Sequence, residues 1–138
     1  MLWTVLAIHP KYRFDWFLEN ILTLVVIPLL ILFYRKGFFS NLSWSLIFVF
    51  LLFHIVGAHY TYSEVPFAEN FSRLLGAERN HYDRLVHLLC GLLLTRPLCE
   101  ILSVKIRAGN GWVRFISFCV ILASGAIYEL MEWLTAMI

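Results

Sequence analysis

Four long apolar runs constrain this chain more than any other feature. A helix crosses a bilayer with about 20 mostly apolar residues, and runs of that kind cover about 17–34, 42–60, 82–104 and 112–138. The chain is 61% hydrophobic and 14% charged, whereas a soluble domain is about 45–50% apolar and about 25% charged. We therefore predict an all-α fold, in which residues 1–138 form a single transmembrane domain built as a polytopic four-helix bundle.

The connections between the runs differ in length. Those at 35–41 and 105–111 are short, so each should join two antiparallel neighbours. The segment between the second and third runs is longer, and its Phe67, Phe71 and Leu74 recur at spacings of three and four. Leu75 extends the same apolar face. This pattern predicts a short amphipathic helix lying on the membrane surface.

The opening "MLWTVLAIHPKYR" is apolar but too short to cross a bilayer, and it lacks the basic start of a signal peptide. We expect an interfacial or re-entrant segment, or the end of a longer helix. The three cysteines lie in apolar runs without a CxxC pair, which is typical of small buried hydrophobes. A net charge of +2 with no basic cluster argues against nucleic acid as a partner.

Basic residues give the expected orientation. Cytoplasmic connections carry an excess of Lys and Arg close to the ends of the spans. The two sides of this bundle have equal numbers of bases, but Arg73 and Arg79 lie further from a span. We therefore expect 35–41 and 105–111 to be cytoplasmic, with both termini and the 61–81 segment outside.

Ionisable residues from three predicted helices converge in the outer half of the membrane. Asp83 and His87 are four residues apart and share a helix face, and Glu129 and Glu132 are three apart. A charge near the bilayer centre costs about 2.5–3.5 kcal/mol, so such groups usually face the bundle interior and are paired. We expect a ring nitrogen of His87 to reach one of four groups: Glu129, Glu132, His54 or His59.

Small residues occur near the same level of the second, third and fourth runs. They are Gly57, Ala58, Gly91, Gly125 and Ala126. Small side chains allow transmembrane helices to approach closely, so we expect the helices to meet here around a polar pocket roofed by the 61–81 segment.

The candidate site residues follow from this pocket. The candidate binding residues are His54, His59, Tyr62, Arg79, His81, Asp83, Arg84, His87, Glu129 and Glu132. The catalytic candidates are His87, Asp83 and Glu129. Imidazole and carboxylate groups also suit a divalent metal cofactor such as zinc, although no compact HExxH-type motif occurs. The candidate metal ligands are His59, His81, His87, Glu129 and Glu132.

Structural explanations stand beside these functional ones. A lone histidine such as His54 is more often a hydrogen-bonded helix residue than a ligand. Arg79 and Arg84 could equally anchor the chain to lipid head groups. Glu129 could equally form an ion pair with Arg84 that serves the fold alone.

Several segments together resemble a known family. They are "AIHPKYRFDWFLEN" (7–20), "GAHYTYSEVPF" (57–67), "ERNHYDRLVHLLCGLLL" (78–94) and "AIYELMEW" (126–133). Over nearly its whole length the chain resembles the bacterial YjdF-type inner-membrane proteins, a domain family of unknown function. The resemblance implies a multi-pass protein of the bacterial inner membrane. It also implies the signature residues His59, Tyr60, Tyr62, Pro66, Arg79, Asn80, His81, Tyr82, Asp83, Arg84, His87, Glu129, Glu132 and Trp133.

The chain departs from the family pattern in two places. Members usually have Phe-X-Gln-Gly where this chain has "LLCG" (88–91), and they continue beyond the last helix into a "GDxWDxxxDM" stretch. The chain ends at Ile138 without that stretch, and is either a natural short form or part of a longer protein. The "DRLVH" segment is also similar to a motif of the VanZ-like membrane proteins.

Two classes of function remain open. In one, the pocket binds a lipid, an ion or a partner, which could be membrane lipid, another membrane protein or a second copy of the chain. In the other, the protein is a membrane enzyme acting on a lipid or lipid-linked head group. A histidine or carboxylate would then be the general base, while Arg79 and Arg84 would hold a phosphate. We favour the binding class, because the chain is short and lacks the distal acidic stretch.

Overall fold

The computed structural model describes residues 2–74, 76, 79–135 and 137, without the side chains of Leu22, Phe71, Arg73, Leu74, Glu132 and Thr135. Its long helices are α2 (Arg13–Arg35), α3 (Asn41–His59), α5 (Tyr82–Lys105) and α6 (Asn110–Thr135). Its short helices are α1 (Leu2–Leu6) and α4 (Pro66–Leu74). The predicted all-α fold is confirmed: no strand occurs in the described part of the chain, and all four long helices are long and apolar enough to cross a membrane.

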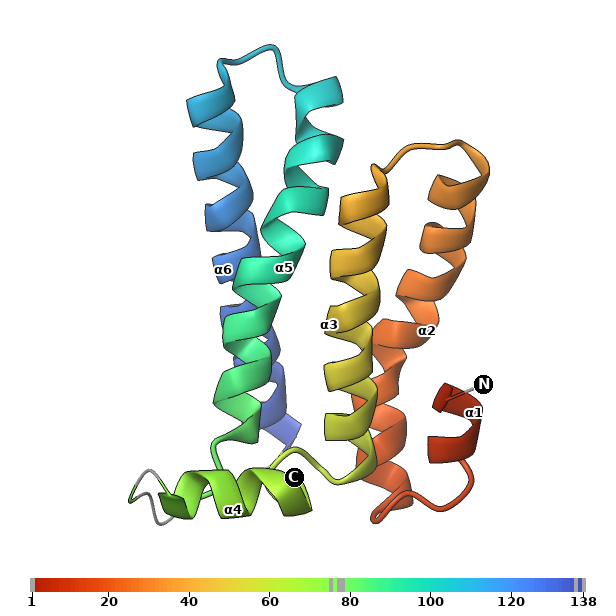
Figure 1. Cartoon of the computed structure of the whole chain (residues 1–138), viewed down its shortest axis with the longest axis vertical. Helices are drawn as coiled ribbons and strands as arrows, with labels where there is room; N and C mark the ends of the chain where they lie inside the picture. The colour runs from red at the N-terminus through yellow and green to blue at the C-terminus, as the bar shows by residue number, and fades with distance from the viewer. Residues whose placement is uncertain (1, 75, 77–78, 136, 138) are drawn as a thin grey trace.

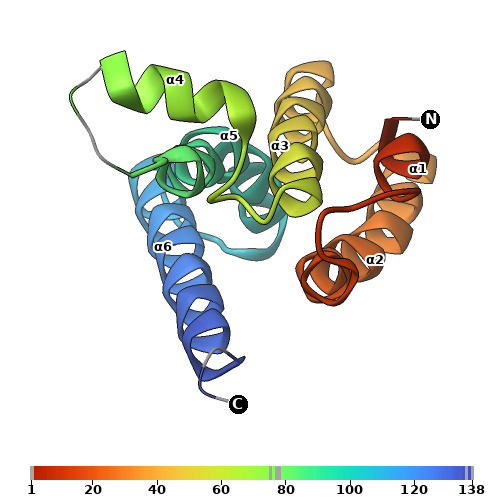
Figure 2. The same cartoon turned by 90° about the horizontal axis from the view of Figure 1, so that it is seen from below.

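The long helices form an open arc. In the end view of Figure 2 they follow one another in the order α2, α3, α5, α6. The most extensive contacts join α3 to α5 and α5 to α6. Helix α4 lies across one end of this arc, which is also the end where α2 begins and α6 finishes (Figure 1). The two short connections lie at the opposite end.

Local signals end one helix and begin the next in the first connection. Gly37 has a φ of +58°, which glycine adopts without a steric penalty. The amide of Gly37 donates to the carbonyl of Tyr34, and the amide of Phe38 donates to the carbonyl of Phe33. This pair of hydrogen bonds is the pattern of a Schellman motif. Ser40 then caps α3 by accepting from the Ser43 amide at 3.2 Å.

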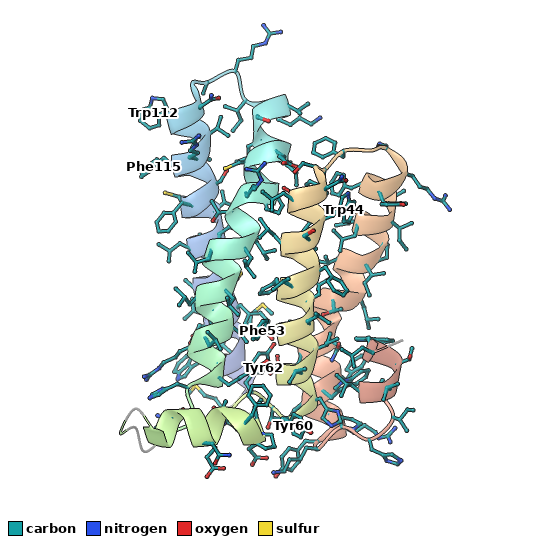
Figure 3. The ribbon with its side chains drawn as sticks, viewed as in Figure 1. Trp44, Phe53, Tyr60, Tyr62, Trp112 and Phe115 are labelled. Atoms are coloured by element: carbon teal, nitrogen blue, oxygen red, sulfur yellow. The ribbon has the colours of Figure 1, made fainter. Side chains whose placement is uncertain are left out.

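Partly or fully exposed aromatic side chains mark the two ends of the helices. Trp44 and Trp112 lie towards the end with the short connections, and Tyr60 lies near α4 (Figure 3). These are positions expected for aromatics at membrane interfaces. Tyr62 and Tyr82 also stand near predicted helix ends, but they are buried, with 7% and 1% of their surface exposed. These two rings therefore belong to the core.

The core lies where α4 meets α3 and α5. Its buried cluster contains Tyr62, Val65, Ala68, Tyr82 and Val86. The hydroxyl of Tyr82 donates to the carbonyl of Phe53 at 2.8 Å, which joins the start of α5 to α3. A buried tyrosine needs such a partner for its hydroxyl, and this one fixes the first turn of α5.

Helix α4 packs its small residues against the protein and leaves Phe67 exposed. The sequence pattern placed Phe67 on the face expected to lie on the membrane; Phe67 is 58% exposed, while Ala68 and Ser72 are buried. Small residues let α4 lie close to the core, and the rings of Phe67 and Tyr82 meet edge to face with their centres 5.7 Å apart. The predicted partners of Phe67, at positions 71, 74 and 75, lie outside the described side chains.

The amino-terminal segment is attached to α2 and α3. The indole of Trp3 donates to Asn20 at 2.8 Å, and His59 shares a hydrogen bond of 2.8 Å with the Leu6 carbonyl. Lys11 forms an ion pair with Glu64. The hydrogen bond to Glu64 raises the pKa of Lys11, so the stability from this pair is present at neutral pH and is lost as pH rises through the raised pKa.

The chain turns sharply after α3 and brings Tyr62 back over Gly57. Thr61 and Tyr62 both have a φ of 51°, which is strained for side chains other than glycine. The Tyr62 amide donates to the Gly57 carbonyl at 2.8 Å. A Cβ atom at Gly57 would lie 2.4 Å from the Tyr62 ring, so this position excludes any larger residue.

We predict that Gly57→Ala lowers the free energy of unfolding by about 1–3 kcal/mol, the usual cost of an extra methyl group in a packed core. Chemical unfolding in detergent, followed by circular dichroism, measures this. The control is Gly111→Ala in α6, where a Cβ atom meets nothing within 4 Å. Equal stability of the Gly57 variant and the wild type would show that the Tyr62 ring does not pack as described.

Candidate functional site

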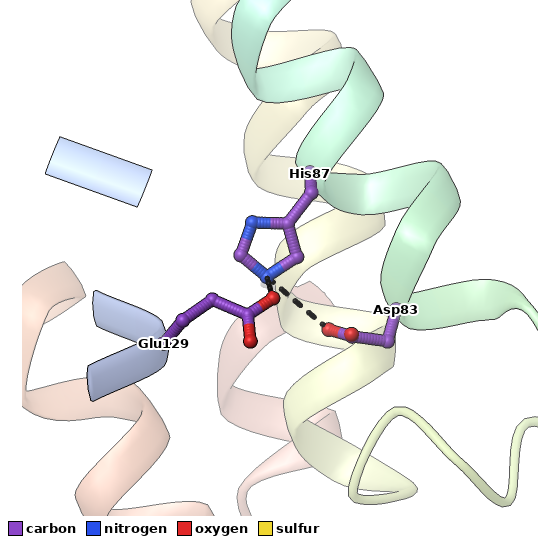
Figure 4. Close-up of side chains that lie close together, drawn as sticks. All are labelled: Asp83, His87 and Glu129. Atoms are coloured by element: carbon purple, nitrogen blue, oxygen red, sulfur yellow. Dashed lines mark ion pairs between the residues drawn. The ribbon is translucent and has the colours of Figure 1, made fainter. Parts of the chain in front are cut away.

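Asp83, His87 and Glu129 converge on one point between α5 and α6 (Figure 4). The Nε2 atom of His87 lies 3.5 Å from Asp83 Oδ1 and 3.4 Å from Glu129 Oε1. The ligand atoms of all three residues lie within 4.8 Å of one another. The structure thus brings His87 to one of the carboxylates that the sequence predicted for it.

Local and tertiary structure both contribute to this arrangement. Asp83 lies in the first turn of α5, where a carboxylate is favoured by the helix dipole. His87 follows one turn later on the same face, because residues four apart are neighbours on a helix. Glu129 reaches them because α6 packs along α5.

A polar cavity of about 440 Å³ opens beside the cluster, at the end of the bundle near α4. It lies between α2, the turn after α3, the start of α5 and the last turns of α6. Its lining residues are Glu19, Thr61, Tyr62, Ser63, Arg79, Asn80, His81, Asp83, Arg84 and Glu129. Phosphate, sugar and amine groups could all find hydrogen-bond partners in it.

A second cavity of about 300 Å³ lies between α5 and α6 and is mostly apolar. Its lining residues are His87, Cys90, Gly91, Phe118, Ile121, Leu122, Gly125, Ala126 and Glu129. Gly91 and Gly125 were predicted to bring helices together, but a Cβ atom at Gly91 would meet nothing within 4 Å. Gly91 therefore leaves space between α5 and α6, whereas a Cβ atom at Gly125 would lie 3.9 Å from His87 Nδ1. Glu129 lines both cavities.

The structure adds one acid to the site that the sequence analysis missed. Glu19 lines the polar cavity and accepts a hydrogen bond of 2.5 Å from the hydroxyl of Tyr128. This bond joins α2 to α6, the two ends of the helical arc. The signal was available, because Glu19 lies inside the first predicted span and ionisable residues within spans are commonly functional.

Two predicted site histidines make contacts elsewhere. His54 is buried, with Nδ1 2.6 Å from the Tyr62 hydroxyl and Nε2 2.7 Å from the Thr23 hydroxyl. It therefore links α2, α3 and the following turn, which matches its structural explanation. His59 is bonded to Leu6, and neither histidine belongs to the cavity-lining set or the three-residue cluster.

The remaining candidates whose side chains are described line the polar cavity. Arg79, His81 and Arg84 line it, and a guanidinium nitrogen of Arg84 lies 3.2 Å from His81 Nδ1, which accepts its hydrogen bond. Glu129 is paired with His87, so the alternative pairing with Arg84 does not occur among the described contacts. The side chain of Glu132 lies outside the described residues.

Removing the hydroxyl that joins α6 to α2 should destabilise the bundle. We predict that Tyr128→Phe lowers the free energy of unfolding by about 0.6–1.7 kcal/mol, the range of hydrogen bonds between membrane helices. Chemical unfolding in detergent provides the measurement. Tyr34→Phe is the matched control, because the Tyr34 hydroxyl has no hydrogen-bond partner among the described residues. Equal losses in both variants would contradict a specific role for the Tyr128 bond.

The helical architecture defines a membrane protein with four helices able to cross a bilayer. The chain belongs to the family described as "Predicted membrane protein (DUF2238)", whose model matches residues 1–138. It is 34% identical to the inner membrane protein YjdF of Escherichia coli strain K12 over 139 aligned residues. That alignment covers 99% of this chain and 65% of the relative, so the chain spans less than two thirds of the relative's length. No solved structure matches.

Proposed function

We propose that this protein binds an anionic lipid, with the head group in the polar cavity and a hydrocarbon chain in the apolar cavity. One observation carries the proposal: the two cavities differ in polarity and share Glu129 as a lining residue. A lipid has the same sequence of polar and apolar parts. The proposal includes four membrane crossings in the bacterial inner membrane, with α4 and the polar cavity on the outer side.

The polar cavity is lined by two arginines, Arg79 and Arg84, and by three acids, Glu19, Asp83 and Glu129, and we assign the phosphate of the head group to the arginines. Arg79 and Arg84 are both exposed and line the cavity beside the neutral polar residues Ser63 and Asn80. Guanidinium groups bind phosphate through paired, charge-assisted hydrogen bonds. The cavity lies at the level where α3 ends and α5 begins, and lipid head groups would surround the bundle there. A phospholipid could therefore enter from the surrounding leaflet.

The apolar cavity suits the hydrocarbon chain. Phe118, Ile121 and Leu122 supply its apolar wall, and Gly91 and Gly125 leave the space. Burying a chain there contributes about 0.8 kcal/mol for each CH₂ group removed from water. The gain over the bilayer interior is much smaller, since lipid tails are equally apolar. The head group should therefore determine affinity, and the apolar cavity should determine how the lipid is oriented.

The combined substitution Arg79→Gln and Arg84→Gln should weaken binding of phosphatidylglycerol by about tenfold or more, since each lost charge-assisted hydrogen bond costs about 1.5–3 kcal/mol and every 1.4 kcal/mol is a factor of ten. Native mass spectrometry of the protein in detergent, with phosphatidylglycerol or phosphatidylcholine added, measures bound lipid. The wild type should prefer the anionic lipid.

The matched control is Arg35→Gln with Lys36→Gln, which removes two charges at the opposite end of the bundle. A further variant, Gly125→Leu, fills the apolar cavity and should reduce bound lipid while circular dichroism shows an intact fold. The proposal is wrong if the double variant at Arg79 and Arg84 binds phosphatidylglycerol as well as the control double variant does.

The orientation part of the proposal has its own test. Single cysteines placed at Ser63 and at Gly109, in a background without the native cysteines, report which side of the membrane each connection faces. In intact cells a membrane-impermeant maleimide should label position 63 and leave position 109 unlabelled until the membrane is permeabilised. The reverse labelling would overturn the orientation and would place the polar cavity on the cytoplasmic side.

An enzyme acting on a lipid head group is the second candidate function. The cluster favours it, because His87 stands between two carboxylates at the edge of the cavity, where an imidazole could accept a proton. Incubation of the protein with phosphatidylglycerol, followed by mass spectrometry of the lipid, separates the two functions. A new lipid product that disappears in His87→Ala would establish the enzyme, and unchanged lipid would support binding alone.

A further inference from the structure

We infer that Asp83, His87 and Glu129 form a binding site for a divalent transition-metal ion of the zinc class. The ligand atoms are Asp83 Oδ1, His87 Nε2 and Glu129 Oε1, which come from α5 and α6 and lie close together (Figure 4). The site does not depend on lipid binding, because the three side chains supply all of its protein ligands.

The distances within the cluster suit metal ligands better than hydrogen bonds. Charge-assisted hydrogen bonds between nitrogen and a carboxylate are usually about 2.7–2.9 Å long, whereas the two distances from His87 are 3.4 and 3.5 Å. Zinc lies about 2.0–2.2 Å from nitrogen and oxygen ligands, which puts neighbouring ligands of a tetrahedron about 3.3–3.6 Å apart. Both distances from His87 fall in that interval, and the ligand atoms of Asp83 and Glu129 lie within 4.8 Å of each other.

The charges of the cluster also favour a cation. Asp83 and Glu129 are two carboxylates near one point, and their described ion pairs are both with the same imidazole. The described side-chain partner of Arg84 is His81. A single proton on His87 would neutralise one carboxylate, while a dication would neutralise both and leave the imidazole neutral. Two uncompensated carboxylates are costly beside an apolar helix interface.

Ligand chemistry selects the type of ion. Magnesium and calcium prefer all-oxygen sites, whereas an imidazole nitrogen with carboxylate oxygens suits zinc and its neighbours in the first transition series. The side chains of Asp83 and Glu129 are 41% and 61% exposed, and both line the polar cavity. An ion can therefore enter from that side, and a coordination position towards the cavity stays open, as in metal sites that bind a further ligand.

The test uses the full chain in detergent, free of affinity tag, chelator and added lipid. Isothermal titration with Zn²⁺ should give one ion per chain, and Co²⁺ should give the visible absorption of a low-coordinate site with a nitrogen ligand. Asp83→Asn, His87→Ala and Glu129→Gln should each weaken Zn²⁺ binding by about tenfold or more, since even a lost second-shell partner costs about 10–100-fold.

The matched controls are His9→Ala and Asp15→Asn, which remove an exposed histidine and an exposed aspartate outside the cluster. Both should bind Zn²⁺ like the wild type. If His87→Ala fails to fold, the near-isosteric Glu129→Gln decides the question. The inference is overturned if the wild type binds no Zn²⁺, or if the cluster variants bind it as tightly as the controls. Because lipid is absent, neither result depends on the lipid-binding proposal.

Discussion

The structure depends on one constraint: polar side chains within apolar helices must find partners inside the protein. In a membrane, an unsatisfied polar group has no water to bind. Two such groups, His54 and Glu19, meet groups on other elements, so their hydrogen bonds also join parts of the fold. His54 joins α3 to Thr23 and to Tyr62, and Glu19 joins α2 to Tyr128. The same contacts that satisfy these groups determine how the helices pack.

The turn after α3 connects this packing to the candidate site. Tyr62 folds back over Gly57 and contacts the Tyr82 ring, with ring centres 6.3 Å apart. Tyr82 is the first residue of α5 and is bonded to α3, so its position sets those of Asp83 and His87. Substitutions in this turn should therefore alter the site as well as the stability, and the two effects need separate measurements.

The site combines three environments in a small volume. A polar cavity with two arginines lies on one side of Glu129 and an apolar cavity lies on the other. The histidine and carboxylate cluster lies between them. A metal ion at this junction would stand beside the head group of a lipid whose chain lies between α5 and α6. This arrangement joins the proposed lipid binding to the inferred metal site, although each can be tested without the other.

The sequence by itself determined the helices and the spacing within each of them. Four apolar runs predicted four long helices, and the four-residue step placed Asp83 and His87 on one face, because the helical period is fixed by the backbone. Only the tertiary structure decided which helices meet. It paired His87 with Glu129, brought the overlooked Glu19 to the cavity, and directed His54 and His59 to other partners. Such contacts depend on the rotation and packing of whole helices, and the sequence pattern along one helix does not contain that information.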